Sequence, residues 1–111
     1  MSQNVWVKSG KVMDLLQNAT TTVTGDWKYK DAPQATIQAT VSGTGAVTAT
    51  VVIDVSNDGV NAVATAAGTI TLSGTTSASD GFVTSSPWKY IRARVTAING
   101  TNATVYVNIG V

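Results

Sequence analysis

Residues 37–53 read IQATVSGTGAVTATVVI, and residues 91–109 read IRARVTAINGTNATVYVNI. Both stretches begin with the pattern I-x-A-x-V, pass through a turn that contains Gly or Asn, and continue with alternating Ala, Thr and Val. Alternation with a period of two is typical of a strand with one buried and one solvated face. We therefore predict that each stretch is a β-hairpin and that the chain is an all-β protein.

The alternation also predicts which side chains form the core. The residues expected to face inward in the two hairpins are Ile37, Ala39, Val41, Val47, Ala49, Val51, Ile53, Val55, Ile91, Ala93, Val95, Ala97, Val105, Val107 and Ile109. Thr48, Thr50, Arg92 and Arg94 alternate with them and are expected to lie outside the core.

The rest of the chain reads as further short strands joined by turns. Strands are predicted at 5–7, 11–16, 20–24, 60–66 and 69–73, an extended piece at 82–83, and loops at 25–33 and 74–81. Residues 11–16 have the best helix propensity in the chain, so one helical turn there is an alternative. In total we expect one domain over residues 1–111, with about eight strands in an antiparallel two-sheet sandwich that resembles a jelly roll.

Composition restricts the classes of function. Charged residues make up 12% of the chain, the net charge is +1, and no basic stripe occurs, so we expect no nucleic-acid partner. No apolar run is long enough for a membrane helix, and the first residues, MSQNVWVKSGKV, lack a secretory signal, which favours synthesis in the cytoplasm.

The missing residue types exclude several chemistries. The chain has no His and no Cys, which excludes a Ser-His-Asp triad, a Cys-His pair and a His-based metal site. The turns at Asn57-Asp58-Gly59 and Ser79-Asp80-Gly81 offer one carboxylate each, too few for calcium. We expect neither an enzyme nor a cofactor.

One face of the last hairpin is a candidate for protein binding. Trp88, Tyr90, Arg92 and Arg94 alternate with the inward residues, and Tyr106 should lie beside them on the neighbouring strand. Aromatic and Arg side chains are enriched at binding hot spots. The alternative is that the two arginines pair with Asp14 or Asp54 on adjacent strands while Trp88 caps the core.

Two W-K-Y triplets allow a second interpretation. Trp27-Lys28-Tyr29 and Trp88-Lys89-Tyr90 could present aromatic rings that stack on sugars, as in a carbohydrate-binding β-sandwich. The alternative is that both tryptophans cap the core at the ends of the sandwich.

The second half of the chain resembles a known family. The pieces VSNDGV (55–60), GTITLSGT (68–75) and PWKYIRARVTAI (87–98) are similar to capsid decoration proteins, also called cement or staple proteins, of short-tailed phages that infect Salmonella. The resemblance implies a β-sandwich that binds the outside of the phage head as a dimer or trimer. It would bridge neighbouring major capsid subunits and stabilise the shell against the pressure of the DNA inside.

Overall fold

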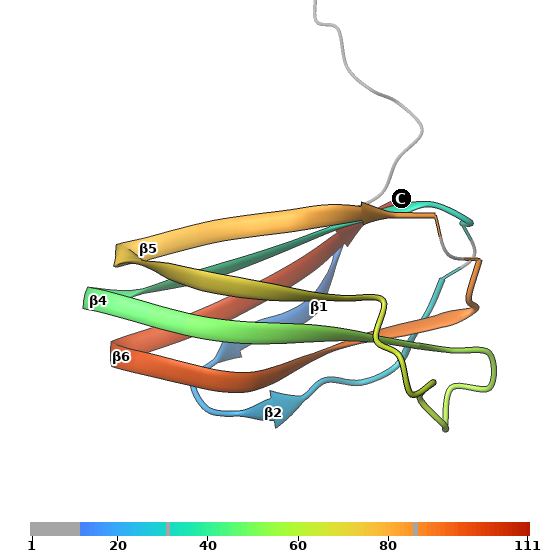
Figure 1. Cartoon of the computed structure of the whole chain (residues 1–111), viewed down its shortest axis with the longest axis horizontal. Helices are drawn as coiled ribbons and strands as arrows, with labels where there is room; N and C mark the ends of the chain where they lie inside the picture. Colours follow the sequence, from blue (N-terminus) through green and yellow to red (C-terminus); the bar gives the residue numbers. More distant parts are fainter. Residues whose placement is uncertain (1–11, 31, 86) are drawn as a thin grey trace, which may run out of the picture.

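The computed structural model describes residues 12–30, 32–85 and 87–111, which form antiparallel β-structure without a helix (Figure 1). The six strands are β1 (Val12–Ala19), β2 (Val23–Thr24), β3 (Lys28–Tyr29), β4 (Ala35–Ser56), β5 (Gly68–Thr84) and β6 (Tyr90–Gly110). They form one hydrogen-bonded sheet in the order β1-β6-β4-β5, and β2 and β3 also pair with β6. The predicted all-β class is confirmed. The described residues form six strands in one sheet, where about eight strands in two sheets were expected.

The three long strands fold back on themselves. β4 has 22 residues, which would extend roughly 73 Å if straight at about 3.3 Å per residue. The longest principal extent of the chain is 49 Å. Figure 1 shows that β4, β5 and β6 each run toward the same end of the molecule, turn there and run back. Each therefore has two arms, and the single sheet folds into two facing layers.

We name the layers after their short strands. The β1 layer contains β1 and the arms 35–42, 77–84 and 103–110, whereas the β2 layer contains β2, β3 and the arms 46–56, 68–75 and 90–98. In both layers an arm of β4 lies between an arm of β5 and an arm of β6.

The two repeated stretches are therefore not hairpins, and this prediction was wrong. Ile37 pairs with Phe82 of β5 and Ile109 of β6, not with the other arm of its own strand. At each corner the arms come to face each other through their side chains instead of their backbone edges. A hairpin and a long strand that bends into two layers both need alternating buried and exposed residues. The sequence pattern therefore does not distinguish them.

Glycine permits the sharp corners. At the corner of β5, a Cβ atom on Gly74 would lie 2.1 Å from the carbonyl oxygen of Ser77. At the corner of β6, Gly100 has φ +126°, a backbone conformation that other residues rarely adopt. The corner of β4 lies beside both, because Thr44 pairs with Thr101 and Ala46 with Thr75.

The core fills the space between the layers. The predicted inward residues are at most 3% exposed, apart from the half-buried Ala97. Thr48 is exposed, as predicted, and Thr50 is half-buried on the outer side. Ile70 and Leu72 of β5 and Leu15 of β1 complete this single cluster.

Other local predictions had mixed outcomes. Residues 12–19 are a strand and not a helical turn, and the strand expected at 20–24 is reduced to β2. The strand expected at 60–66 is a loop, whose Val63 and Ala67 amides donate to the carbonyls of Val55 and Ile53. The loop expected at 74–81 belongs to β5, and no position in this part of the edge strand is fully buried, so its sequence shows no apolar alternation. The strand expected at 5–7 lies outside the described residues.

Within the described residues, no helix has the length and apolar character needed to cross a membrane.

Candidate binding surfaces

Three charged side chains meet on the outer side of the β2 layer. Asp54 on β4 pairs across the sheet with Arg92 on β6, and Arg94 lies two residues further along β6. The Nε atoms of Arg92 and Arg94 lie 2.9 and 3.0 Å from Oδ2 of Asp54, and Nη2 of Arg94 lies 3.2 Å from Oδ1. One carboxylate thus accepts hydrogen bonds from both arginines, which is the alternative that the sequence left open.

Trp27 contacts Arg92 in this group of charges, and together the four residues form the Asp54 cluster. Trp27 lies between β2 and β3, and the Gly25 amide holds this segment to β6 by donating to the Ala93 carbonyl at 2.9 Å. The guanidinium carbon of Arg92 lies 4.4 Å from the centre of a Trp27 ring, a cation–π contact. The side chain of Asp54 is only 5% exposed, whereas those of Arg92 and Arg94 are 22% and 37% exposed.

The cluster shifts the titration of its own members. Burial by itself raises the pKa of Asp54, but hydrogen bonds from Arg94 and Arg92 and their positive charges outweigh it, so the pKa lies below its usual value. The hydrogen bond to Asp54 raises the pKa of Arg94. The carboxylate is therefore kept ionised, and the arrangement joins β4 to β6.

The two W-K-Y triplets meet at their tyrosines and extend in opposite directions from there. Tyr29 pairs with Tyr90 between β3 and β6, and their rings meet edge to face at 5.5 Å between centres. Trp88 is half-buried and packs against the core, as the core-capping alternative predicted. Trp27 has Arg92 over one ring face. Trp88 is therefore engaged with the core, and Arg92 covers one ring face of Trp27, which disfavours stacking of either ring on a sugar.

Tyr106 lies apart from the other residues of the predicted binding face. The corner of β6 separates it from Arg92 and Arg94, and Val105 and Val107 beside it point into the same core as Ala93 and Val95. Tyr106 therefore projects from the outer side of the β1 layer, where it pairs with Thr40. Trp88, Tyr90, Arg92 and Arg94 remain at the β2 layer, so the structure does not bring the five residues onto one surface.

The outer side of the β1 layer is almost free of charge, and we name it the neutral face. Its strands and arms (12–19, 35–42, 77–84 and 103–110) contain no Lys or Arg, and their acids are Asp14 and Asp80. Ser79 links two strands here: its hydroxyl lies 2.9 Å from Gln38 Nε2 and 2.7 Å from the Thr40 hydroxyl. The Tyr106 hydroxyl donates to Asn18 Oδ1 at 2.5 Å, and the Tyr106 side chain is 41% exposed.

Exposed valines lie at one end of the neutral face. Val12, Gly110, Thr36 and Val83 form one row across the four strands, and Val12 and Val83 are 74% and 70% exposed. Sequence reasoning missed this face because it searched for residues that carry chemistry. The signal was the absence of Lys and Arg from four segments that are far apart in the chain.

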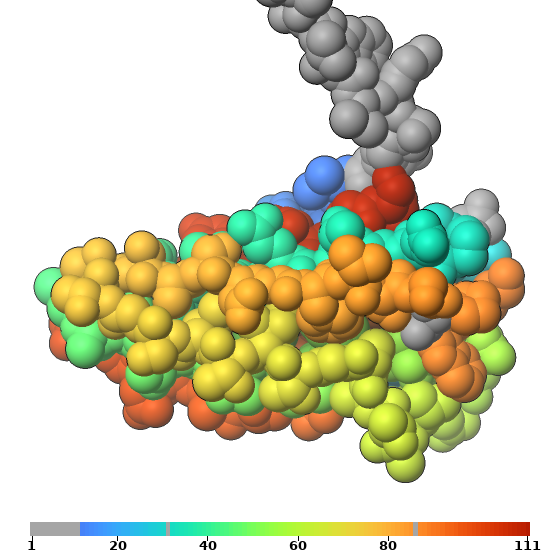
Figure 2. All heavy atoms as spheres, turned by 45° about the horizontal axis from the view of Figure 1, so that its top comes forward, coloured from blue at the N-terminus to red at the C-terminus, as the bar shows by residue number. Residues whose placement is uncertain are grey.

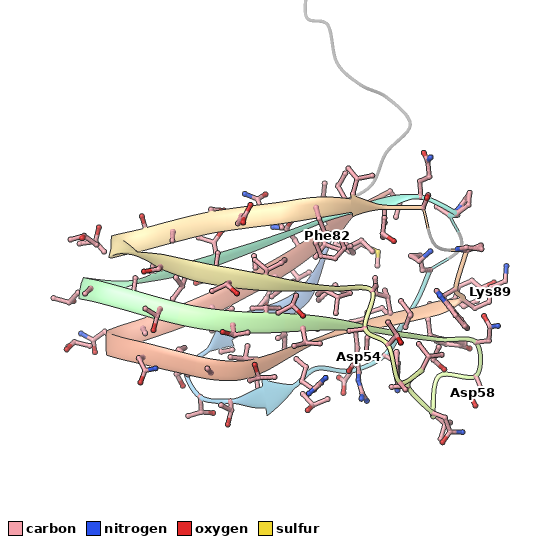
Figure 3. The ribbon with its side chains drawn as sticks, viewed as in Figure 1. Asp54, Asp58, Phe82 and Lys89 are labelled. Carbon is pink, nitrogen blue, oxygen red and sulfur yellow. The ribbon has the colours of Figure 1, made fainter. Side chains whose placement is uncertain are left out.

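The turn after β4 is closed by its own carboxylate. Figure 3 shows Asp58 in the loop that follows Asp54 and the end of β4. Asp58 Oδ1 accepts hydrogen bonds from the Ser56 hydroxyl at 2.7 Å and from the Val60 and Asn61 amides at 2.9 and 2.8 Å. These hydrogen bonds lower the pKa of Asp58 well below its usual range. Among the described residues, no three His, Cys, Asp or Glu side chains gather as a metal site.

Comparisons with known proteins define the fold but not a family. No protein-family model matches the chain. No curated protein matches it either. The structure is similar to that of the SPBc2 prophage-derived protein YomS, with a TM-score of 0.63 and 12% identity, over 97% of this chain and 100% of that chain.

Two further similarities are weaker. One is to a chain in the structure of the infectious bursal disease virus Gx strain, with a TM-score of 0.48, 13% identity, and 94% of this chain but 32% of that chain covered. The other is to Bacillus endospore appendages, with a TM-score of 0.39, 20% identity and coverage of 94% and 84%. The similarity to YomS shows a shared fold, and the resemblance to decoration proteins stays a prediction.

Proposed function

We propose that this chain is a structural protein of a phage virion, and that it decorates the outer surface of the assembled head by binding neighbouring major capsid subunits. The observation that carries the proposal is that its fold corresponds to that of a prophage-derived protein over nearly the whole length of both chains. The resemblance of residues 55–98 to decoration proteins supports the more specific role on the head.

The neutral face is the surface best suited to a capsid. It spans one arm of each long strand together with β1, and Tyr106 lies within it. Uncharged polar groups are cheaper to remove from water than ions, and tyrosine offers a large contact area with little entropy to lose. The arginines of the opposite face already bond to Asp54, so a partner would have to compete for them.

The proposed mechanism is multivalent binding to the assembled shell. A protein that binds only the assembled form stabilises it by mass action, and bridging adjacent subunits multiplies weak contacts. No bond is made or broken in this mechanism, so it requires no catalytic group or cofactor.

Co-sedimentation with heads tests this proposal. Purified protein is mixed with DNA-free heads of the phage that encodes it, or with unassembled major capsid protein, and then centrifuged. We expect the protein to pellet with heads and not to bind free subunits. Tyr106→Ala should lower occupancy about tenfold, which corresponds to roughly 1.4 kcal/mol of contact energy.

Tyr29→Ala is the matched control, because Tyr29 is 57% exposed but belongs to the β2 layer. Its occupancy should equal that of wild type. Wild-type protein that stays in the supernatant would reject head decoration, and an equal loss in both variants would reject the neutral face as the contact surface.

A further inference from the structure

Among the described residues, no strand pairs with the outer edge of β5 in either layer. β5 is the last strand in the sheet order, and its ladder with β4 runs from Ala35–Thr84 to Ile53–Gly68, so one side of β5 is satisfied along both arms. Among the described residues, no backbone hydrogen bond outside the strand ladders involves residues 68–83 of β5. In Figure 2 the atoms of β5, yellow to orange, lie at the surface with no other segment over them.

This edge has few of the features that usually prevent pairing; the one charge, Asp80, pairs with the buried Ala39 and so lies on the inner side of the strand. Proteins protect exposed edges with Lys, Pro, bulges or short strands. β5 has 17 residues without Lys, Arg or Pro, and its register with β4 shifts only at the corner. The opposite edge differs, since β1 has eight residues and two register shifts against β6, and β2 and β3 have two residues each.

The space between the two arms of β5 is already filled. Phe82 comes from one arm and lies against Gly68 of the other, where a Cβ atom would meet its ring at 2.5 Å. Figure 3 shows Phe82 between the arms. Phe82 thus closes the space between the arms near Gly68, and along the edge itself the backbone hydrogen-bonding groups are the feature that a partner strand could use.

We propose that the edge of β5 pairs with the edge of β5 in a second copy of this chain. Antiparallel pairing of a strand with itself follows from a two-fold axis, the commonest symmetry of oligomers. In such pairing the side chains of β5 lie near the same side chains of the second copy, where like charges would repel. Asp80 is the sole charge of β5. Thr69 and Thr71 are exposed on the outer side, where cross-strand Thr pairs are favourable.

The geometry of the fold extends this pairing to both layers. An axis perpendicular to the layers joins arm 68–75 to its copy in one layer and arm 77–84 to its copy in the other. Each layer then continues from one molecule into the next, and both neutral faces lie on the same side of the dimer. If the proposed function holds, the dimer attaches to the shell at two points, which increases its avidity.

The mass in solution and a charged edge variant test the pairing without any shell. Analytical ultracentrifugation over a wide concentration range should give twice the 11.4 kDa of the chain for wild type. Thr71→Lys with Val83→Lys adds two like charges to the edge, and it should give the monomer mass with an unchanged melting temperature. Thr36→Lys with Thr48→Lys adds the same charge to exposed positions of β4 and should remain dimeric.

A single-cysteine scan provides a test that does not depend on the charged variant folding. The chain has no Cys, so Thr69→Cys, Thr71→Cys and Ser73→Cys each carry one thiol. On mild oxidation at least one of them should form a disulfide dimer, whereas Thr96→Cys on β6 should not. A monomeric wild type, a trimer, or an absence of cross-linking along β5 would overturn the proposal, whatever the outcome of the head-binding experiment.

Discussion

The two layers share one core but have different outer faces. In the β2 layer, the Asp54 cluster holds β4 and β6 together through ion pairs, and Trp27 contacts Arg92. In the β1 layer, the same two strands carry Gln, Thr, Tyr and Asn on the outside, and neutral hydrogen bonds link neighbouring side chains. The same strands thus present two kinds of surface, because each strand turns back at its corner.

The difference shows that residue type alone does not identify a binding surface. Arg92 and Arg94 have the composition of a hot spot, but a buried carboxylate on the neighbouring strand accepts their hydrogen bonds. On the neutral face the hydrogen bonds described between side chains join uncharged groups, which an incoming protein displaces at a lower cost than an ion pair. We therefore expect substitutions of side chains in ion pairs within the fold to lower mainly its stability. Substitutions of exposed side chains without such ion pairs should lower mainly binding.

The largest effect should come from the core that both layers share. Val95 and Val105 lie in opposite layers and are 2% and 0% exposed. Changing either to Ala should destabilise the protein by about 1–3 kcal/mol, from lost apolar burial and a partly relaxed cavity. The control Thr48→Ala should cost well under that, and urea denaturation measures all three. A large cost for one valine only would mean that the layers do not share a core equally.

The second largest effect should be a loss of stability when the Asp54 cluster is disrupted, and it should occur in the β2 layer only. Asp54→Asn should cost about 1–2 kcal/mol, less than the loss of a fully buried ion pair, because both arginines are partly hydrated. Asp14→Asn in the β1 layer is the matched control and should stay within about 0.5 kcal/mol of wild type, as exposed substitutions usually do. Equal costs would show that the Asp54 cluster does not distinguish the layers.

The pH dependence of stability sharpens the same contrast. The pKa of Asp54 is lower in the folded state than in the unfolded state, so its contribution is present above the unfolded value of about 4 and is lost as the pH falls through the folded pKa. The stability difference between wild type and Asp54→Asn should therefore shrink below about pH 4. Asp58 also has a lowered pKa, but both proteins contain it, so it cancels in the difference. Thermal melts over an acidic pH series measure this, and a difference that grows toward low pH would contradict it.

Sequence reasoning identified the buried side chains but not the pairing of the strands. Ile37, Val51, Val95 and Val107 are buried as predicted, because alternation depends only on which face meets the core. Alternation carries no information about whether a strand bonds to its own other arm or to a neighbour. The corner of β5 was missed for a related reason, since no position at 74–81 is fully buried and the sequence there shows no apolar alternation.

The sequence placed Tyr106 in the wrong layer for the same reason. Treating 91–109 as a flat hairpin placed Tyr106 beside Arg92 and Arg94, and the corner of β6 moves it to the opposite layer. The pairing of both arginines with Asp54 was foreseen as an alternative because Asp54 also lies on an alternating strand. The choice between binding and pairing required the register of β4 against β6, which the sequence does not encode locally.

The smallest effect should come from the neutral face. The Tyr106 hydroxyl donates to Asn18 on β1, and Tyr106→Phe removes that hydrogen bond while keeping the ring. The site is partly exposed, so water replaces the lost partner and we expect a cost of about 0.5 kcal/mol, the low end for a hydrogen bond. Tyr29→Phe in the β2 layer should cost less, because the contact of Tyr29 with Tyr90 is between rings.

Asn18 completes this test but cannot be read from one substitution. Asn18 has φ +53°, a conformation that Asn tolerates better than Ala, so Asn18→Ala combines a backbone cost with the lost hydrogen bond. The cycle of Tyr106→Phe, Asn18→Ala and the double variant isolates the coupling between the two side chains, since the backbone cost appears in both halves and cancels. We expect a coupling of about 0.5 kcal/mol by urea denaturation. A coupling near zero would mean that the hydroxyl does not help to hold β1 to β6 and is free to bond to a partner at the neutral face.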